Sequence, residues 1–319
     1  MQTNKPYRLR MKAGHLLIKG FCLMLFVIAG CEKEVDIHLT GSGGKPVVYS
    51  FIQPDSSFRI SLSQSVDILN AANAAPLRNA YVQILKNNII YRTLSFNSNA
   101  MWNQYNDVTF SAGDSVKINI LDDQTEIASC LTYIPKLISI IDTDTIKEFR
   151  TGEDGFIAEH INLKVRFTDP LDTADYYQIM IIENTLKSLT DKDTLIIDTL
   201  TIPKTDLFVF NNSMGISNLG NIDFQGLFTD KNIDGATHRL QMSFPAKTFR
   251  KAADDKSKTY EIRLYHLSED YYNYFRAQII STSFEGLPIF EPVKFPSNVT
   301  NGYGLVTGLT LSKVTLEVK

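Results

Sequence analysis

Cysteine is scarce in this chain, which holds only Cys22, Cys31 and Cys130 in 319 residues. Cys22 and Cys31 lie within the first 31 residues, so Cys130 is the single thiol of the remaining chain. One cysteine cannot form an intramolecular disulfide, a CxxC pair or a multi-thiolate zinc site. Cys130 alternates with apolar neighbours in "IASCLTYI", which predicts a small buried side chain and not a nucleophile.

Long hydrophobic runs are also lacking. The longest near the N-terminus, residues 21–29, has nine residues, whereas a transmembrane helix needs about 20. Five basic residues and no acidic residue precede this run, an arrangement typical of a secretory signal peptide. The run ends in Ile28-Ala29-Gly30-Cys31, which resembles a bacterial lipobox. We therefore predict a lipoprotein signal peptide over residues 1–30 and a lipid anchor on Cys31, the alternative being an ordinary secretory signal with an accidental cysteine.

The residues behind Cys31 predict where the anchored protein resides. The stretch "CEKEVD" is similar to the charged export tag of lipoproteins that reach the outer face of the outer membrane in the Bacteroidota. The alternative is a solvated start to a tether. The whole segment 31–45 is polar and includes "TGSGGK", so we expect a flexible tether with a reach of about 20 Å. The predicted location is the outer membrane, with the body facing the cell exterior.

Positive charge is in short supply. Removal of residues 1–30 takes away five basic residues and no acidic one, which changes the formal net charge from −3 to −8. No run rich in Lys and Arg with interleaved aromatic residues is present. A protein of this charge binds phosphate backbones poorly, so nucleic acid is not an expected partner.

Catalytic motifs are missing as well. The chain contains no HExxH, no HxH and no GxSxG elbow, and its histidines are far apart in sequence. The stretch "GYGLVTG" at 302–308 leads into a predicted strand, so it supplies no helix N-terminus for a phosphate. The acidic pairs Asp142/Asp144 and Asp169/Asp172 lie in turn-like stretches. We expect no enzymatic activity and no cofactor.

What the sequence does have is short strands. Apolar residues alternate with polar ones at period two, with turn signals about every ten residues, a pattern that favours a β-sandwich. An Ig-like sandwich is predicted over residues 46–136, with strands at 47–52, 58–66, 114–122 and 127–134 and a hairpin around Asn87-Asn88 within 80–96.

A second mainly β domain is predicted over residues 137–319, after a change of character between Pro135 and Arg150. Its predicted strands are 160–170, 175–184, 193–202, 207–210, 238–245, 260–266 and 305–318. One helix is expected near residues 268–282. Ser268 suits its N-cap, and Tyr272, Phe275 and Ile279 fall on one face. The fold class is therefore mainly β, with two sandwich-like domains and one helix.

The strongest metal candidate is "DKNIDG" at 230–235. Asp230, Asn232 and Asp234, followed by a glycine, match the first half of an EF-hand calcium loop. The twelfth position is Gln241 where a bidentate glutamate is needed, and no flanking helices are expected. A plain hairpin turn is the favoured interpretation and calcium the alternative.

A modification pattern recurs more often than average composition predicts. Asp, then Ser or Thr, then an apolar residue resembles the O-glycosylation acceptor of exported proteins in the Bacteroidota. The alternative is that Asp-Thr pairs suit the ends of strands. The candidate acceptors are Ser115, Thr145, Thr173, Thr194 and Thr199.

Three blocks together carry a family resemblance: "CEKEVD", "VRFTDPLDTADYY" at 165–177, and the C-terminal block "LSEDYYNYFRAQIIS…PIFEPVKFPSNVTNGYGLVTG". They resemble a Bacteroidota outer-membrane lipoprotein family known as domain-of-unknown-function family 4249, over nearly the whole chain. The final block is the most specific, although residues 305–307 are Leu-Val-Thr where members often have an aromatic residue. The resemblance brings no catalytic residues. It implies a gene beside a TonB-dependent receptor and an accessory role in uptake or surface assembly.

Two functions follow as expectations. The first is a non-enzymatic, lipid-anchored accessory protein that associates with a TonB-dependent receptor. The alternative is a free-standing surface protein that binds a glycan, a peptide or a host protein. A docking protein is expected to expose an apolar patch, whereas a sugar-binding protein exposes aromatic faces.

Overall fold

The computed structural model describes residues 44–66, 76–77, 79–97, 99–151, 155–189, 192–203, 206–210, 222–283 and 293–316. The described residues all belong to one compact unit, Ser42–Lys319. The predicted signal peptide, Cys31 and nearly all of the predicted tether lie outside the described residues.

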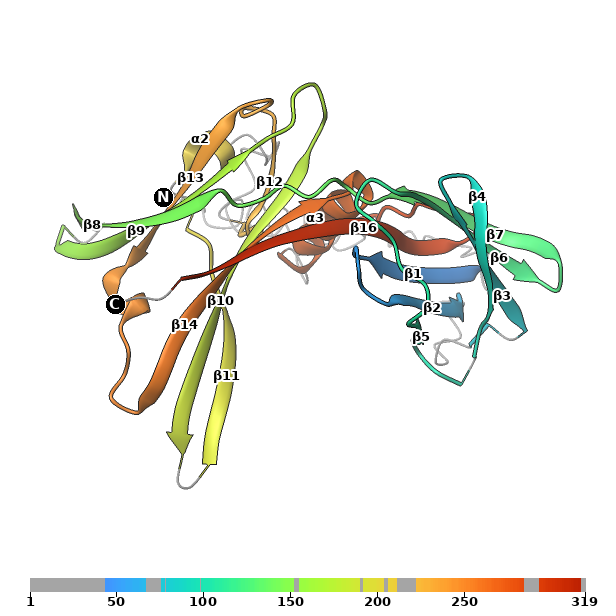
Figure 1. The fold of residues 1–319 in the computed structure, drawn as a ribbon, viewed down its shortest axis with the longest axis horizontal. Coiled ribbons are helices and arrows are strands. Elements are labelled where there is room, and N and C mark those ends of the chain that lie inside the picture. The colour runs from blue at the N-terminus through green and yellow to red at the C-terminus, as the bar shows by residue number, and fades with distance from the viewer. Residues whose placement is uncertain are drawn as a thin grey trace, which may run out of the picture. The chain divides into compact units, whose positions relative to one another are not determined.

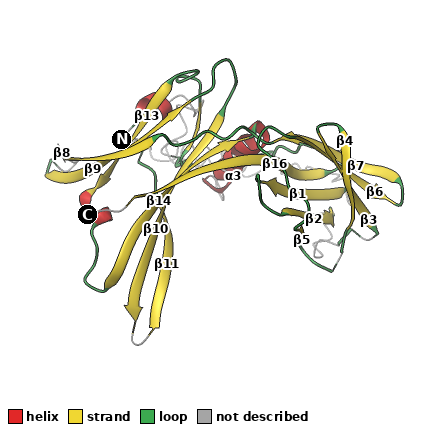
Figure 2. Cartoon of the chain, in the orientation of Figure 1, coloured by secondary structure: helices red, strands yellow, loops and turns green. Residues whose placement is uncertain are grey.

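Strands dominate the described chain (Figure 2), which confirms the mainly β prediction. The strands are β1 (Pro46–Ile52), β2 (Phe58–Gln64), β3 (Ala80–Lys86), β4 (Ile89–Ser95), β5 (Asn103–Tyr105), β6 (Ser115–Asp122), β7 (Thr125–Tyr133), β8 (Asp142–Thr151), β9 (Ile157–Thr168), β10 (Tyr176–Leu189), β11 (Lys192–Leu200), β12 (Leu227–Thr229), β13 (Thr237–Pro245), β14 (Asp255–Leu267), β15 (Val299–Thr300) and β16 (Tyr303–Leu316). The helices are α2 (Leu207–Phe210), the 3-10 helix η1 (Ala246–Phe249) and α3 (Glu269–Ser283).

The strands form three sheets. The largest runs β11-β10-β14-β16-β1-β2-β5, with β12 beside β10. The second is β13-β9-β8 and the third is β15-β7-β6-β3-β4. Apolar residues fill the space between layers because alternate residues of each strand point to the same face. This arrangement agrees with the predicted sandwich-like fold.

Two hydrophobic cores lie on the large sheet. The first joins β1 and β2 to β3, β6 and β7, and the second joins β10 and β14 to β9 and β13. The first core takes its residues from 48–134 together with Val299 and Val306, and the second from 138–264. Two C-terminal strands therefore contribute to the first half of the large sheet and its partner sheet, since β15 pairs with β7 and β16 with β1. The domain boundary at 136/137 stays a prediction.

Strand β16 is shared by both sandwiches (Figure 1). Its first half pairs in parallel with β1, from Val47↔Tyr303 to Ile52↔Gly308. Its second half pairs antiparallel with β14, from Leu267↔Leu309 to Tyr260↔Leu316. One strand therefore makes a continuous sheet out of two chain segments that are far apart in sequence.

Helix α3 packs on the outer face of the large sheet. Tyr272 and Ile279 are buried against Leu267 and Leu309. The Ser268 hydroxyl accepts a hydrogen bond from the Tyr271 N–H at 3.4 Å, in the position of an N-cap. The helix prediction and its buried face are confirmed.

The C-terminal motif "SNVTNGYG" ties this helix to β16. The Asn298 amide donates to Asp270 Oδ2 at 3.0 Å and to the Val306 carbonyl at 2.6 Å. Its oxygen accepts from the Val306 N–H at 3.0 Å. The side chain of Asn298 thus takes the place of a strand neighbour for Val306, and the segment acts as a structural crossover.

Three local predictions are wrong. Residues 207–210 form the helical turn α2 and not a strand, because the N–H groups of Val209 and Phe210 bond back to the Asp206 carbonyl. Residues 142–151 form strand β8, although the Asp142/Asp144 pair suggested a turn. Residues 230–235 do not close a hairpin, because the flanking β12 and β13 pair with β10 and β9 and not with each other.

Other local predictions are confirmed. Asn87 and Asn88 connect β3 and β4 with φ of 51° and 66°, the positive values that a two-residue type I′ hairpin requires. Cys130 is 3% exposed, and burial raises the pKa of its thiol to about 12. The thiol is therefore protonated and inert at neutral pH.

Candidate functional site

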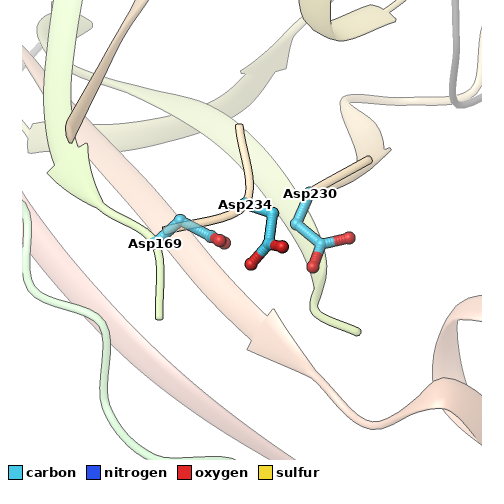
Figure 3. A group of neighbouring side chains, drawn as sticks. All are labelled: Asp169, Asp230 and Asp234. Atoms are coloured by element: carbon cyan, nitrogen blue, oxygen red, sulfur yellow. The ribbon is translucent and has the colours of Figure 1, made fainter. Parts of the chain in front are cut away.

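Three aspartates meet where the second sandwich ends. Asp169 directly follows β9, Asp230 follows β12, and Asp234 lies in the turn before β13. One carboxylate oxygen of each lies within 4.8 Å of the others, and Figure 3 shows the three side chains side by side. We call this group the acidic cluster.

Strand pairing creates the acidic cluster. Thr168 at the end of β9 is opposite Thr237 at the start of β13. The loop before β13 must therefore pass beside residue 169, and the Asp169 N–H donates to the Ala236 carbonyl at 3.0 Å. Gly235, with φ of 69°, turns the chain so that its N–H reaches Asp169 Oδ2 at 3.0 Å.

The acidic cluster is linked to a buried ion pair. His266 Nε2 lies 2.7 Å from Asp175 Oδ1, and His266 Nδ1 lies 2.8 Å from the Lys136 carbonyl. A carboxylate and a carbonyl are both acceptors, so both contacts are hydrogen bonds from the ring when both ring nitrogens carry hydrogens, as in an imidazolium. Both residues are buried, at 4% and 6% exposure.

Tyr177 connects the two groups. Its ring stacks on the His266 ring, with centroids 5.0 Å apart, which is a favourable position for a cation over an aromatic face. Its hydroxyl donates to Asp169 Oδ1 at 2.6 Å. Asp230 completes the network, since its Oδ2 accepts from the Asp175 N–H at 2.9 Å.

The environment sets different protonation preferences for these carboxyl groups. Burial raises the pKa of Asp169 to about 6; the repulsion of Asp175 and Asp230 adds to this, against the hydrogen bonds from Tyr177 and Gly235. Burial and the nearby Asp175 and Asp234 also raise the pKa of Asp230. For Asp175, burial acts in the same direction, but hydrogen bonds from His266 and Thr173 outweigh it and the pKa is lowered.

A hard divalent cation is the ligand that clustered carboxylates could hold. Calcium takes about six to eight oxygen ligands, so three carboxylates would need water or carbonyl oxygens beside them. The existing hydrogen bonds also hold the loop together without an ion. The structure brings predicted Asp230 and Asp234 together and adds Asp169, while Asn232 is half-buried on the same turn. Calcium binding stays a prediction.

The raised pKa of Asp169 predicts a pH-dependent difference in stability. The folded protein holds this proton up to about pH 6, whereas the reference value for the carboxyl is 3.8. The stabilising effect is therefore present near pH 4 and is lost as the pH rises through 6. Relative to wild type, Asp169→Asn should gain about 2 kcal/mol in unfolding free energy between pH 4 and pH 7.

Urea unfolding of both proteins at the two pH values, with a chelator present, measures this difference. Asp172→Asn, on the exposed part of the same loop, is the control and should show no comparable change. Parallel behaviour of Asp169→Asn and wild type would contradict the prediction. Repetition with calcium tests the cation, because an ion held by ionised Asp169 would raise the stability of wild type selectively at pH 7.

The predicted acceptors of O-glycans differ in access. Thr145 on β8 and Thr194 and Thr199 on β11 are exposed. Thr173 is exposed in the loop after β9 and donates to Asp175 Oδ2 at 2.5 Å. Ser115 is half-buried at the first residue of β6. Modification stays a prediction for all five, with steric access best at the three positions on edge strands.

Taken together, the shared sheet and the buried network define a mainly β protein with two sandwiches and a network of buried polar residues in the second. The family model described as "Domain of unknown function (DUF4249)" matches residues 32–314, and the chain belongs to this family. A comparison with curated proteins finds no match. Within the part of the chain that the structure describes, no helix has the length and apolar character needed to cross a membrane.

Proposed function

We propose that this protein is a non-enzymatic, lipid-anchored protein on the outer face of the outer membrane that associates with a TonB-dependent receptor, in nutrient uptake or surface assembly. The observation that carries the anchor is Cys31, placed directly after a short apolar run and Ala29-Gly30. The receptor partner is supported by the family resemblance, which is an argument by analogy.

An exposed apolar tip supports docking to a partner. Phe149 of β8 is 76% exposed, and Phe156 and Ile157 at the start of β9 are 75% and 71% exposed. Thr151 pairs with Ile157, so Phe149 and Ile157 lie on the same face of the β8–β9 hairpin. Large exposed aromatic and aliphatic side chains are typical anchors in protein interfaces. We call these three residues the hairpin tip.

Gentle detergent extraction of the tagged, full-length protein from its native membrane, followed by mass spectrometry, tests the proposal. We expect lipidated Cys31 and a β-barrel receptor in stoichiometric amount. Replacement of the three hairpin-tip residues by serine should remove the receptor from the extract. Extraction of the protein alone, with Cys31 lipidated, would contradict the receptor association.

A matched control lies on another edge strand. Ile89 and Ile90 of β4 are 73% and 62% exposed, so their replacement by serine removes a comparable apolar surface. This variant should keep the receptor. Equal loss in both variants would show that the hairpin tip has no special role.

The alternative function is a free-standing surface protein that binds a glycan, a peptide or a host protein. A separate feature favours it, namely an aromatic cavity on the first sandwich.

A further inference from the structure

A cavity of about 300 Å³ opens on the outer face of the large sheet. Phe51 of β1, Arg59 of β2 and Trp102, the residue before β5, line it. Trp102 is the only tryptophan of the chain. We call this cavity the aromatic slot.

The alternation of side chains along each strand explains why these three side chains point away from the core. In β2, Phe58 and Ile60 are buried, so Arg59 between them points to the opposite face. In β1, Ile52 is buried and Phe51 is 42% exposed. Arg59 pairs with Gln104 in β5, and Trp102 lies two residues before Gln104 on the same face. The slot is therefore built on three neighbouring strands.

Neighbouring contacts hold the slot in shape. The Asn103 side chain accepts from the Asn97 N–H at 2.9 Å and donates to the Asn97 carbonyl at 3.1 Å, which fixes the loop that carries Trp102. Phe51 packs edge-on against Tyr271 of α3, with centroids 5.9 Å apart. The Arg59 guanidinium lies over the Trp102 ring at 5.7 Å. The three described lining residues are thus positioned by the fold and need no ligand to assemble.

The side-chain N–H groups of Arg59 and Trp102 have no hydrogen-bond or ion-pair partner among the described residues. Other arginines, such as Arg166 and Arg263, pair with Asp142 and Glu261. The Arg59 guanidinium makes no ion pair or hydrogen bond with a described residue, and neither does Trp102 Nε1. Both are donors only, and Arg59 carries a permanent positive charge. The slot therefore combines aromatic faces with donors that call for an anionic, acceptor-rich ligand.

We propose that the aromatic slot binds a saccharide unit that carries a carboxylate, such as a uronic acid. The C–H face of the sugar ring would pack on Phe51 and on the part of Trp102 that the Arg59 guanidinium leaves uncovered, and the carboxylate would pair with Arg59. Binding pockets for small molecules begin at about 300 Å³, so the slot suits a single ring of a chain.

Two features favour a saccharide over a peptide. The slot lies on the face of β1 and β2, each of which already has a strand on both sides, so a peptide cannot add to them as a further strand. A pyranose ring also presents a flat C–H face and several acceptors at once, which matches the mixed lining. This inference does not rest on the association with a receptor.

The single tryptophan provides the test. Purified full-length protein in detergent is titrated with a galacturonic acid trisaccharide and, separately, with the neutral galactose trisaccharide, which differs in lacking the carboxylates. Indole emission, excited where tyrosine does not absorb, reports on Trp102 alone. We expect a saturable change with the acidic sugar at an affinity at least tenfold higher than with the neutral sugar.

Arginine variants test the contact itself. Arg59→Gln should weaken binding of the acidic sugar at least tenfold and remove the preference over the neutral sugar. Arg92→Gln is the matched control, because Arg92 also lies over an aromatic ring, that of Tyr91 at 4.9 Å, on edge strand β4. It should leave binding unchanged.

Three outcomes would overturn the proposal: equal affinity for the two sugars, no effect of Arg59→Gln in a folded protein, or a response only to an acidic peptide such as triglutamate. The extraction experiment has a separate readout, so failure of this inference and failure of receptor docking are distinguishable.

Discussion

Gly304→Ala is expected to lower the unfolding free energy by more than about 4 kcal/mol, a large part of the stability of an ordinary domain. Gly304 has φ of 113°, and a Cβ there would lie 2.0 Å from the Val48 carbonyl oxygen and 2.9 Å from the Val48 nitrogen. These are backbone atoms of the neighbouring strand, with which Gly304 is in register. No side-chain rotation can relieve the contact, so β1 and β16 would have to separate.

Gly113→Ala is the matched control for this prediction. Gly113 has φ of 90°, but a Cβ there meets no atom within 4 Å. Its replacement carries only the cost of a left-handed backbone, about 1–2 kcal/mol. Urea unfolding followed by circular dichroism measures both losses. Similar losses in the two variants would show that the close approach of β1 and β16 is not the cause.

His266→Phe is expected to cost about 3–5 kcal/mol of stability. Phenylalanine preserves an aromatic ring beside Tyr177, but it leaves the buried Asp175 carboxylate without its positive partner. The Lys136 carbonyl also loses a donor and, among the described residues, keeps the Thr310 hydroxyl at 3.2 Å. The loss arises chiefly from the uncompensated buried charge.

A double variant separates charge from packing. Asp175→Asn combined with His266→Phe removes the charge that the single change exposes, so part of the stability should return. His160→Phe, at a more exposed histidine on β9, should change the unfolding free energy by less than about 1 kcal/mol. Thermal and urea unfolding of wild type, Asp175→Asn, His266→Phe and the double variant gives the coupling energy. Strictly additive losses would contradict a role for the ion pair.

The sequence predicts the strands whose two faces differ. Residues 58–66 and 114–122 alternate clearly because one face of each is buried, and the strands are found there. Strand β8 is an edge strand with most residues exposed on both faces, so it carries no alternation to detect. The error at 207–210 has another cause, since the apolar run "LFVF" is compatible with a buried helical turn as well as a strand.

The candidate sites, too, could be predicted from the sequence only in part. The spacing of Asp230 and Asp234 within one turn is visible in the sequence, but Asp169 joins them only through the pairing of β9 with β13. The aromatic slot likewise needs Phe51 from β1, Arg59 from β2 and Trp102 from the residue before β5. Local periodicity carries no information on such pairings, because any strand of suitable pattern could be the neighbour.

Strand β16 has a consequence for the order in which the chain folds. A chain that emerges from its N-terminus presents β1 early, yet the strand that pairs along one side of β1 begins only at Tyr303. Until then β1 has an open edge, and Val299 and Val306 are missing from the first core. Completion of the sheet needs a contact between β1 and β16, which are far apart in sequence. Such long-range pairing forms slowly, and until it forms the unpaired edge of β1 is prone to aggregation. Removal of the last fifteen or so residues should therefore disturb the first sandwich as much as the second, although it deletes nothing from residues 46–136.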